Sequence, residues 1–270
     1  MGVIARCLNC HTVFRAKLVT GDEYTSLYQN PALMETPFYL ANKFAADSTA
    51  EPMPTFSRGL QQLGELLTPG RILDVGCSYG AFMMLAQESG WEAYGVELNS
   101  SAVQFAREQR HLNVYQGTIE QAAYPAEHFD AVTLWDVIEH FDSPVSTLRE
   151  IHRVLAPGGV LSIFTINQES LLTTVGHALY KMSLSKWKSL MSLFYDIHHN
   201  FFFSPRSISY LLNDTGFEVR EIQFAAANVR RWRTVPISEI MILGTDVIDF
   251  ISKFVNRRYR MFVLARKVAR

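Results

Sequence analysis

The sequence has few cysteines, almost no net charge and no long apolar run. Three cysteines among 270 residues argue against a disulfide-stabilised scaffold and fit a reducing compartment. The formal net charge of −1 gives no global field that would attract nucleic acid. No apolar signal-peptide region and no stretch of about 18 apolar residues occurs. These absences predict a cytoplasmic protein without a membrane-spanning helix.

A glycine-containing loop between a strand and a helix is the most informative stretch. Residues Ile72–Val75 predict a short strand, and residues 81–86 predict the first turns of a helix. Gly76 and Gly80 lie between them. Glycine allows backbone angles that other residues avoid and lets a ligand approach the main chain. The N-terminus of the helix then directs unpaired N–H groups at that ligand, as in cofactor-binding loops.

An acidic residue follows at the distance that dinucleotide-binding folds use. Residues 91–97 predict a second strand, which ends at Glu97. This position is about twenty residues beyond the glycines, where such folds place the carboxylate that binds ribose hydroxyls. The alternative interpretation of Glu97 is a surface charge.

Four motifs, in register, resemble those of class I S-adenosylmethionine-dependent methyltransferases. In spacing and order they are similar to the ubiquinone-biosynthesis-like branch, over roughly residues 55–225. Ser78 replaces a glycine that this family commonly has. The motifs are Ile72–Gly80, Phe129–Val132, Asp136–His140 and Arg153–Gly159.

The resemblance implies S-adenosyl-L-methionine as the cofactor. Glu97 would accept hydrogen bonds from the ribose hydroxyls, Thr118 would lie near the adenine, and Asp74 would orient the loop or reach the ammonium group through water. The expected cofactor-binding residues are Asp74, Gly76, Cys77, Ser78, Gly80, Glu97, Leu98, Thr118, Ile119 and Trp135.

Strands and helices are expected to alternate along the core, which predicts a mostly parallel sheet covered on both faces. With the resemblance, this predicts an α/β, doubly wound, seven-stranded Rossmann-like methyltransferase fold with helical insertions. Ser100 is the expected N-cap of the second core helix. The expected strands are 72–75, 93–97, 114–116, 131–135, 160–165 and an antiparallel 259–265. The expected helices are 56–67, 81–88, 100–110, 119–122 and 144–154, with Ser204 and Pro205 beginning a later one.

Two helical insertions are expected in a methyltransferase domain that spans residues 56–270. They are residues 168–203 and 228–256. The first could cap the domain, close over the substrate, or contact a membrane surface through residues 171–194. From Glu221 onward, ten basic residues oppose four acidic ones. This basic C-terminal part is either a solvated face or a surface for an anionic substrate or membrane.

The N-terminal extension, residues 1–55, carries a Cys-x-x-Cys-His motif at Cys7 and Cys10. Haem attachment, a zinc knuckle and half of a degenerate zinc ribbon compete as interpretations. Zinc prefers four ligands, and one cysteine pair supplies two. We therefore expect no metal here, and no metal-binding residues elsewhere. By resemblance, helices in this extension would cover the cofactor.

His199 and His140 are the candidate catalytic bases. A histidine titrates near neutral pH and can take a proton from an oxygen or nitrogen nucleophile. His140 could instead only hold the loop after the fourth core strand, and His198 offers the same chemistry as its neighbour His199.

The predicted function is methyl transfer to a small molecule, most simply an O-methylation of a sugar, a quinone-like compound or a secondary metabolite. Sequence motifs of adenine-N6 and cytosine-C5 methylation are missing, so nucleic acid is not the expected substrate. The alternatives are a non-catalytic S-adenosylmethionine-binding scaffold and a peripheral membrane protein that methylates a lipid-linked substrate. The oligomeric state is left open.

Overall fold

Strands and helices alternate through most of the chain. The computed structural model describes residues 3–20, 23, 26, 29–30, 40, 43–44, 52–182, 195, 198–226 and 239–268. The strands are β1 (Ile4–Arg6), β2 (Val13–Arg15), β3 (Arg71–Val75), β4 (Glu92–Glu97), β5 (Asn113–Gln116), β6 (Phe129–Trp135), β7 (Leu155–Ile166), β8 (Phe201–Phe202), β9 (Phe217–Ala225) and β10 (Arg260–Lys267). The helices are α4 (Met53–Gly64), α5 (Ala81–Glu88), α6 (Ser100–Arg110), α7 (Ile119–Ala122), the 3₁₀ turn η2 (Ile138–His140), α8 (Pro144–Val154), α9 (Leu171–Met182), α11 (Pro205–Asp214) and α12 (Glu239–Phe254).

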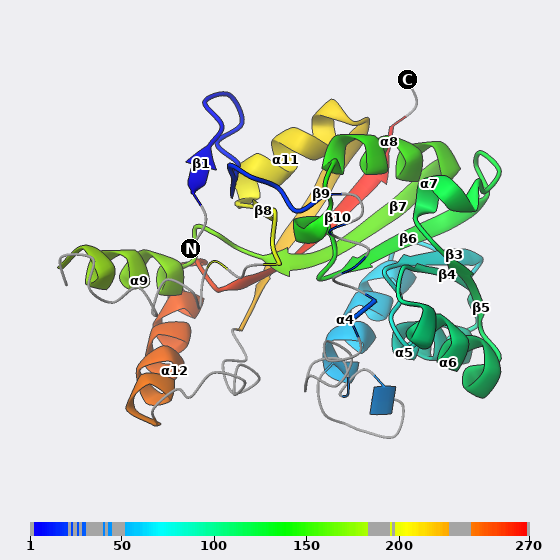
Figure 1. Cartoon of the computed structure of the whole chain (residues 1–270), viewed down its shortest axis with the longest axis horizontal. Coiled ribbons are helices and arrows are strands. Elements are labelled where there is room, and N and C mark those ends of the chain that lie inside the picture. The colour runs from blue at the N-terminus through cyan, green and yellow to red at the C-terminus, as the bar shows by residue number, and fades with distance from the viewer. Residues whose placement is uncertain are drawn as a thin grey trace.

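Seven strands form the central sheet, in the order β5–β4–β3–β6–β7–β10–β9 (Figure 1). Strands β5, β4, β3, β6 and β7 are parallel, and β10 runs antiparallel to both of its neighbours. The chain passes outward from β3 through β4 to β5, then returns to β6 on the other side of β3. Such a reversal of strand order opens a crevice at the carboxyl ends of the strands, where α/β proteins bind ligands. The predicted fold class is confirmed.

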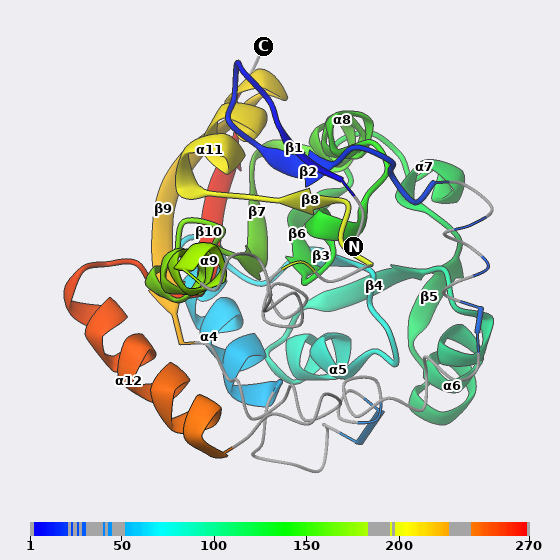
Figure 2. The same ribbon diagram turned by 60° about the vertical axis from the view of Figure 1, so that its left-hand side comes forward.

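Side chains that alternate along each strand build two cores, one on each face of the sheet. Ile72 joins the core beneath α4, α5 and α6, whereas the next residue, Leu73, joins the core beneath α8 and α11. The same alternation separates Phe262 from Val263 in β10. Apolar residues on both faces are expected for strands that helices cover on both sides, as Figure 2 shows.

Three element ends differ from the sequence prediction. Helix α6 is capped by Asn99 rather than Ser100, because the Asn99 side chain accepts a hydrogen bond from the Ala102 N–H at 2.8 Å. Helix α4 begins and ends three residues earlier than expected, with Pro54 in its first turn. Strand β7 begins at Leu155 instead of Val160, because Leu155 already pairs with Phe129 before an irregularity in the ladder. Ser204 and Pro205 begin α11 as predicted.

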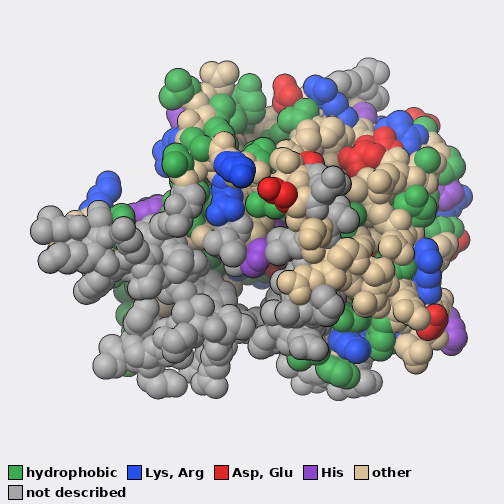
Figure 3. All heavy atoms as spheres, viewed as in Figure 1, with side chains coloured by type: hydrophobic (Ala, Val, Ile, Leu, Met, Phe, Trp, Pro, Cys, Tyr) green, Lys and Arg blue, Asp and Glu red, His purple; other side chains and the backbone are tan. Residues whose placement is uncertain are grey.

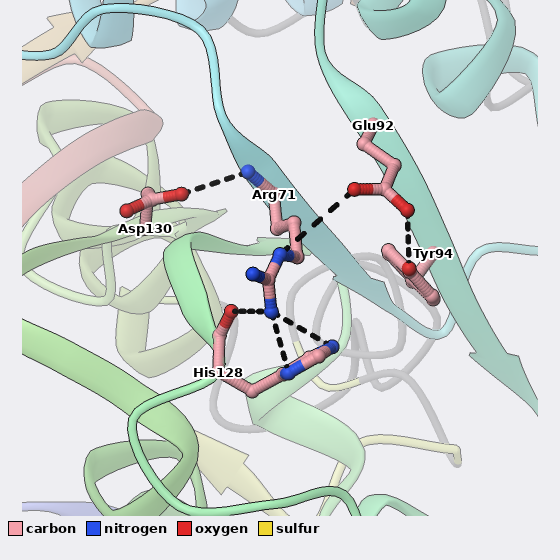
Figure 4. Close-up of polar contacts among 5 residues, drawn as sticks. All are labelled: Arg71, Glu92, Tyr94, His128 and Asp130. Atoms are coloured by element: carbon pink, nitrogen blue, oxygen red, sulfur yellow. Dashed lines mark hydrogen bonds and ion pairs between the residues drawn. The ribbon is translucent and has the colours of Figure 1, made fainter.

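A network of exposed polar side chains joins the amino ends of the central strands (Figure 4). The Arg71 N–H donates to the Asp130 carboxylate at 2.8 Å, and the Arg71 guanidinium lies 2.7 Å from His128 Nδ1 and 3.8 Å from Glu92. Exposed ion pairs contribute at most about 1 kcal/mol each. This end is opposite to the crevice, so we assign the network a structural purpose only.

A small second sheet, not predicted from the sequence, joins the N-terminal hairpin to a later part of the chain. Strands β1, β2 and β8 pair in that order, all antiparallel. Cys7 and Cys10 lie in the turn of this hairpin and are both partly buried. The hairpin is thereby packed beside η2 at the carboxyl end of β6.

The expected insertions are helical where the structure describes them. Helices α9 and α12 contact each other beside the sheet (Figure 1). Residues 183–194, 196–197 and 227–238 lie outside the described residues. Strand β8 also lies within the first insertion, which was expected to be helical. Among the helices that the structure describes, none combines the length and apolar character needed to cross a membrane.

The Asn200 side chain links the small sheet to η2 through hydrogen bonds. It is fully buried, its Oδ1 accepts from the Val19 N–H at 2.9 Å, and its Nδ2 lies 2.9 Å from the Val19 oxygen and 3.2 Å from the His140 oxygen. Asn200→Ala would leave these buried groups without partners. We expect it to lower the free energy of unfolding by about 2–3 kcal/mol, measured by urea denaturation.

The matched control is Asn213→Ala, because Asn213 is exposed on α11. Exposed substitutions of this kind usually change stability by less than about 0.5 kcal/mol. Equal stability of the two variants would contradict the importance assigned to Asn200.

Candidate active site

The glycine loop begins where β3 ends and turns through three left-handed residues. Gly76 and Gly80 have φ values of 74° and 82°, and Ser78 has a φ of 50°. A Cβ at Gly76 would lie 2.6 Å from a Val137 methyl, so only glycine fits there. Ser78 takes the left-handed conformation although it is not glycine, a conformation that costs of order 1 kcal/mol or more.

Glu97 holds this loop from the end of β4. One carboxylate oxygen accepts from the Ser78 N–H and the other from the Asn99 N–H, both at 2.8 Å. Glu97 is 8% exposed, and burial raises the pKa of its carboxyl while the two N–H groups oppose that rise. Each carboxylate oxygen keeps a second lone pair that could accept from a ligand hydroxyl. The surface-charge interpretation of Glu97 is therefore wrong.

Asp74 and Cys77 are buried below the loop. Burial raises the pKa of the Asp74 carboxyl to about 8, although Thr133 Oγ1 donates to it at 2.7 Å. Burial and the neighbouring carboxylates Glu97 and Asp74 also raise the pKa of the Cys77 thiol. The Cys77 sulfur packs against Gly95, where a Cβ would approach it to 2.7 Å. A thiol in this environment stays protonated and is a poor nucleophile.

Leu98, Thr118 and Ile119 border the same end of the sheet. Thr118 caps α7 by accepting from the Gln121 N–H, and Ile119 is buried. The Leu98 carbonyl accepts from Gln29 Nε2 at 2.8 Å. The described part of the N-terminal extension therefore reaches the rim of the expected cofactor site.

Trp135 ends β6, and its ring packs into the core. It lies with ring centroids 5.4 Å from Phe56 and 5.0 Å from Phe82, and a Cβ at Gly59 would clash with it. The indole is 9% exposed. Trp135 thus fixes α4 against the sheet at the carboxyl end of β6.

The structure brings His140 and His199 together at the carboxyl end of β6. Their ring centroids are 4.6 Å apart and the rings are nearly perpendicular. His140 Nδ1 lies 2.9 Å from the His198 carbonyl oxygen. Because a carbonyl only accepts, Nδ1 carries the proton of the neutral ring and Nε2 keeps its lone pair.

Glu139 completes this cluster from below. It is 1% exposed, Thr165 Oγ1 donates to one carboxylate oxygen at 2.9 Å, and the other oxygen is buried without a hydrogen-bond partner. Burial raises the pKa of the Glu139 carboxyl to about 7. Ligand atoms of Glu139, His140 and His199 lie within 4.8 Å of one another, so the three residues could also hold a metal ion.

Two further residues near this cluster were missed by the sequence analysis. Asn200 anchors the chain directly after His199, and its backbone N–H donates to the Glu139 backbone carbonyl oxygen at 2.8 Å. Arg260, at the start of β10, forms an ion pair with Asp136 and stacks over Phe164 at 4.4 Å. The Asn200–Glu139 and Arg260–Asp136 contacts each join segments more than 50 residues apart, so no pattern of neighbouring residues predicts them.

The glycine loop fits the cofactor expected from the resemblance. Ser78 Oγ is buried without a hydrogen-bond partner, which leaves a donor for a polar ligand. Gly76 opens the backbone, and the two Glu97 oxygens face the loop with free lone pairs. These features suit the amino-acid and ribose portions of S-adenosylmethionine, respectively.

Comparison with known proteins agrees with this fit. A family model described as a methyltransferase domain matches residues 50–222. The ubiquinone biosynthesis O-methyltransferase of Nitrosospira multiformis is 28% identical over 194 residues, covering 68% of this chain and 74% of that protein. The same enzyme of Marinobacter nauticus is 29% identical over 192 residues, covering 66% and 73%, respectively.

Solved structures share the fold. A SAM-dependent methyltransferase from Archaeoglobus fulgidus superposes with a TM-score of 0.56 at 21% identity, covering 85% of this chain and 99% of that chain. Phosphoethanolamine N-methyltransferase 2 of Haemonchus contortus, in complex with S-adenosyl-L-methionine, gives a TM-score of 0.60 at 15% identity, covering 95% of this chain and 62% of that chain. The chain therefore belongs to the methyltransferase domain family and is an S-adenosylmethionine-dependent methyltransferase that acts on a small molecule.

Proposed function

We propose that this methyltransferase methylates a hydroxyl oxygen of its acceptor, with His199 as the general base. The observation that carries the proposal is the His140–His199 pair at the carboxyl end of β6, backed by Glu139. A hydroxyl is a weak nucleophile until a base takes its proton, and a neutral imidazole is suited to that task near pH 7. The two relatives named above are called O-methyltransferases, which supports oxygen as the acceptor atom.

The cofactor supplies a methyl group already activated on a sulfonium, so the protein mainly positions the acceptor and excludes water. Gly76 and Ser78 would bind the amino-acid portion, Glu97 the ribose hydroxyls, and Thr118 would border the adenine. His199 would take the hydroxyl proton as the methyl group transfers. Glu139 would stabilise the resulting imidazolium, since ligand atoms of the two residues lie within 4.8 Å.

The acceptor would be selected by the segments that surround the core sheet. Helix α9 and the hairpin β1–β2 both stand beyond the carboxyl edge of the sheet. We propose that residues 168–203 and the segment from residue 228 form the acceptor wall. Sugar, quinone-like and secondary-metabolite acceptors fit this proposal. Peripheral membrane contact through residues 171–194 and the basic C-terminal part stays a prediction.

Glu97→Ala should weaken binding of S-adenosylhomocysteine. It removes the acceptor of two ribose hydrogen bonds and releases the Ser78 N–H, so we expect a cost on the order of 2–4 kcal/mol. Calorimetry measures it, with the exposed Glu108→Ala as the control. Equal affinities of wild type and Glu97→Ala would contradict the assignment of Glu97 to ribose binding.

Binding of S-adenosylmethionine should strengthen as pH rises from 6 to 8. Asp74, with its pKa of about 8 in the cofactor-free protein, is protonated below that pH. The cationic ammonium group favours the ionised carboxylate, so binding releases a proton and the affinity gains up to about tenfold per pH unit. In Asp74→Asn this slope should disappear. A flat pH profile of the wild type would show that Asp74 only orients the loop.

His199→Ala should lower kcat by roughly a hundredfold or more and leave cofactor affinity unchanged. Methyl transfer to a panel of sugar, phenolic and quinol hydroxyls would be followed by mass spectrometry of the O-methyl product. His198→Ala is the matched control, because His198 contributes a backbone carbonyl to His140 that the substitution keeps.

Normal turnover of His199→Ala would overturn the base assignment. If EDTA removes the activity of the wild type and a divalent metal restores it, a metal held by the Glu139 cluster, rather than a free imidazole, activates the hydroxyl.

A further inference from the structure

A pocket of about 340 Å³ lies between β1, β2 and α9, and its α9 side belongs to the proposed acceptor wall. Its apolar floor includes Val13 and Phe202. Positively charged side chains approach it from three different segments: Arg6 from β1, Lys181 from α9 and Arg257 from the turn after α12. In Figure 3, Lys and Arg side chains gather on this part of the surface, over β1 and α9.

The wall formed by α9 follows helical spacing. Thr174, His177, Ala178 and Lys181 all line the pocket. Residues three, four and seven positions apart lie on one helix face, so α9 turns a single face to the pocket. This face carries the cation Lys181 at its far end, and Thr174 on the same face accepts a hydrogen bond from the Arg257 guanidinium.

Charge in the pocket is strongly unbalanced. Three fixed cations face one acidic lining residue, Glu169. In the part of the chain that the structure describes, neither Arg6 nor Lys181 forms an ion pair with a carboxylate. The three cations and one carboxylate give a fixed net charge of +2, which complements a dianion such as a phosphate monoester.

The polar groups are held in position for such a ligand. Arg257 donates through Nε to the Glu169 backbone carbonyl at 2.9 Å and through Nη2 to Thr174 Oγ1 at 2.8 Å, which leaves three of its five N–H groups. Gln168 Nε2 donates to the Tyr195 hydroxyl at 2.6 Å, and that hydroxyl lies 2.9 Å from His177 Nε2.

Lys181 and Arg6 lie close enough to His177 to affect its pKa. Burial lowers the pKa of this imidazole, and the charges of Lys181 and Arg6 lower it further. The positive charges of Lys181 and Arg6 therefore act on His177, which lines the pocket.

The pocket adjoins the proposed catalytic histidines. Phe202 lines it, and the Phe202 ring lies 5.9 Å, between centroids, from the His199 ring. Gln168 lines it as well, and lies just beyond the carboxyl end of β7. A single acceptor could therefore present a hydroxyl to His199 and an anionic group to the pocket.

We infer that this pocket is a phosphate-binding subsite and that it takes a phosphate ester carried by the methyl acceptor. The assignment to the acceptor rests on the proposed function, whereas the binding of phosphate does not. A free phosphate ion and a phosphate ester would bind through the same oxygen atoms. The experiment therefore needs two arms to distinguish them.

The first arm titrates inorganic phosphate into the full chain and follows it by ³¹P NMR. The proteins are the wild type, the double variant Arg6→Gln/Lys181→Gln, and the control Arg149→Gln/Arg220→Gln, which removes two exposed charges elsewhere. We expect saturable binding to the wild type and the control, and binding roughly tenfold weaker in the pocket variant. No binding to the wild type, or equal binding to all three, would overturn the subsite.

The second arm measures methyl transfer to pairs of hydroxyl compounds that differ only by a phosphate ester. The wild type should favour the phosphorylated member by roughly tenfold in kcat/KM, and the pocket variant should lose that preference. Loss of phosphate binding in the first arm without any such preference would assign the pocket to a free phosphate ion and overturn the acceptor assignment.

S-Adenosylhomocysteine binding separates these outcomes from failure of the proposed function. Equal binding in all three proteins shows that the fold and the cofactor site are intact. Methylation of the unphosphorylated hydroxyls by wild type, but not by His199→Ala, tests the base independently of the pocket. A pocket variant that binds S-adenosylhomocysteine as the wild type does and loses the phosphate preference is the result we expect.

Discussion

The contact of the Glu97 carboxylate with the Ser78 N–H is the interaction on which the site depends. It joins the end of β4 to the glycine loop after β3 and holds Ser78 in a left-handed conformation. Hydrogen bonds to a carboxylate are about twice as strong as neutral ones, and burial strengthens them further. The loop is therefore shaped before a ligand arrives, and the same carboxylate retains lone pairs for that ligand. Preorganisation of this kind reduces the ordering that binding would otherwise require.

Beside the preorganised cofactor loop, the proposed acceptor-binding part of the site is formed by segments that are distant from one another in the chain. Asn200 links β8 to the N-terminal hairpin and to η2, and so determines where His199 stands. The basic pocket is divided among β1, α9 and the turn at Arg257. Since the core sheet is accounted for by cofactor binding, differences in acceptor can arise by changing these added segments without disturbing the sheet.

Local signals made much of the fold predictable from the sequence. The strand–loop–helix at Gly76 and the N-cap at Ser204 depend on neighbouring residues, and the alternation of strands and helices follows the order of the chain. The small sheet was missed because β8 has only two residues and pairs with a strand nearly 190 positions earlier. Asn99 was missed as the N-cap because Asn99 and Ser100 are adjacent and both residue types commonly cap helices. Only the structure shows that the Asn99 side chain is the one that reaches the Ala102 N–H.

In the candidate site, too, features set by neighbouring residues were predicted and features set by the complete fold were not. Glu97 was predicted because its spacing from the glycines is set by one strand and one helix. His140 and His199 were predicted separately, but their contact depends on the return of the chain through Asn200. The Asp136–Arg260 pair and the convergence of Arg6, Lys181 and Arg257 depend on the complete fold, and no spacing in the sequence encodes them.

A crystal structure of the chain with S-adenosylhomocysteine tests the central claim most directly. The account predicts that both ribose hydroxyls donate to Glu97, that Ser78 Oγ gains a partner in the amino-acid portion, and that the sulfur faces the open side shared with His199. A nucleoside bound away from Glu97, or a sulfur directed away from the histidine pair, would contradict it.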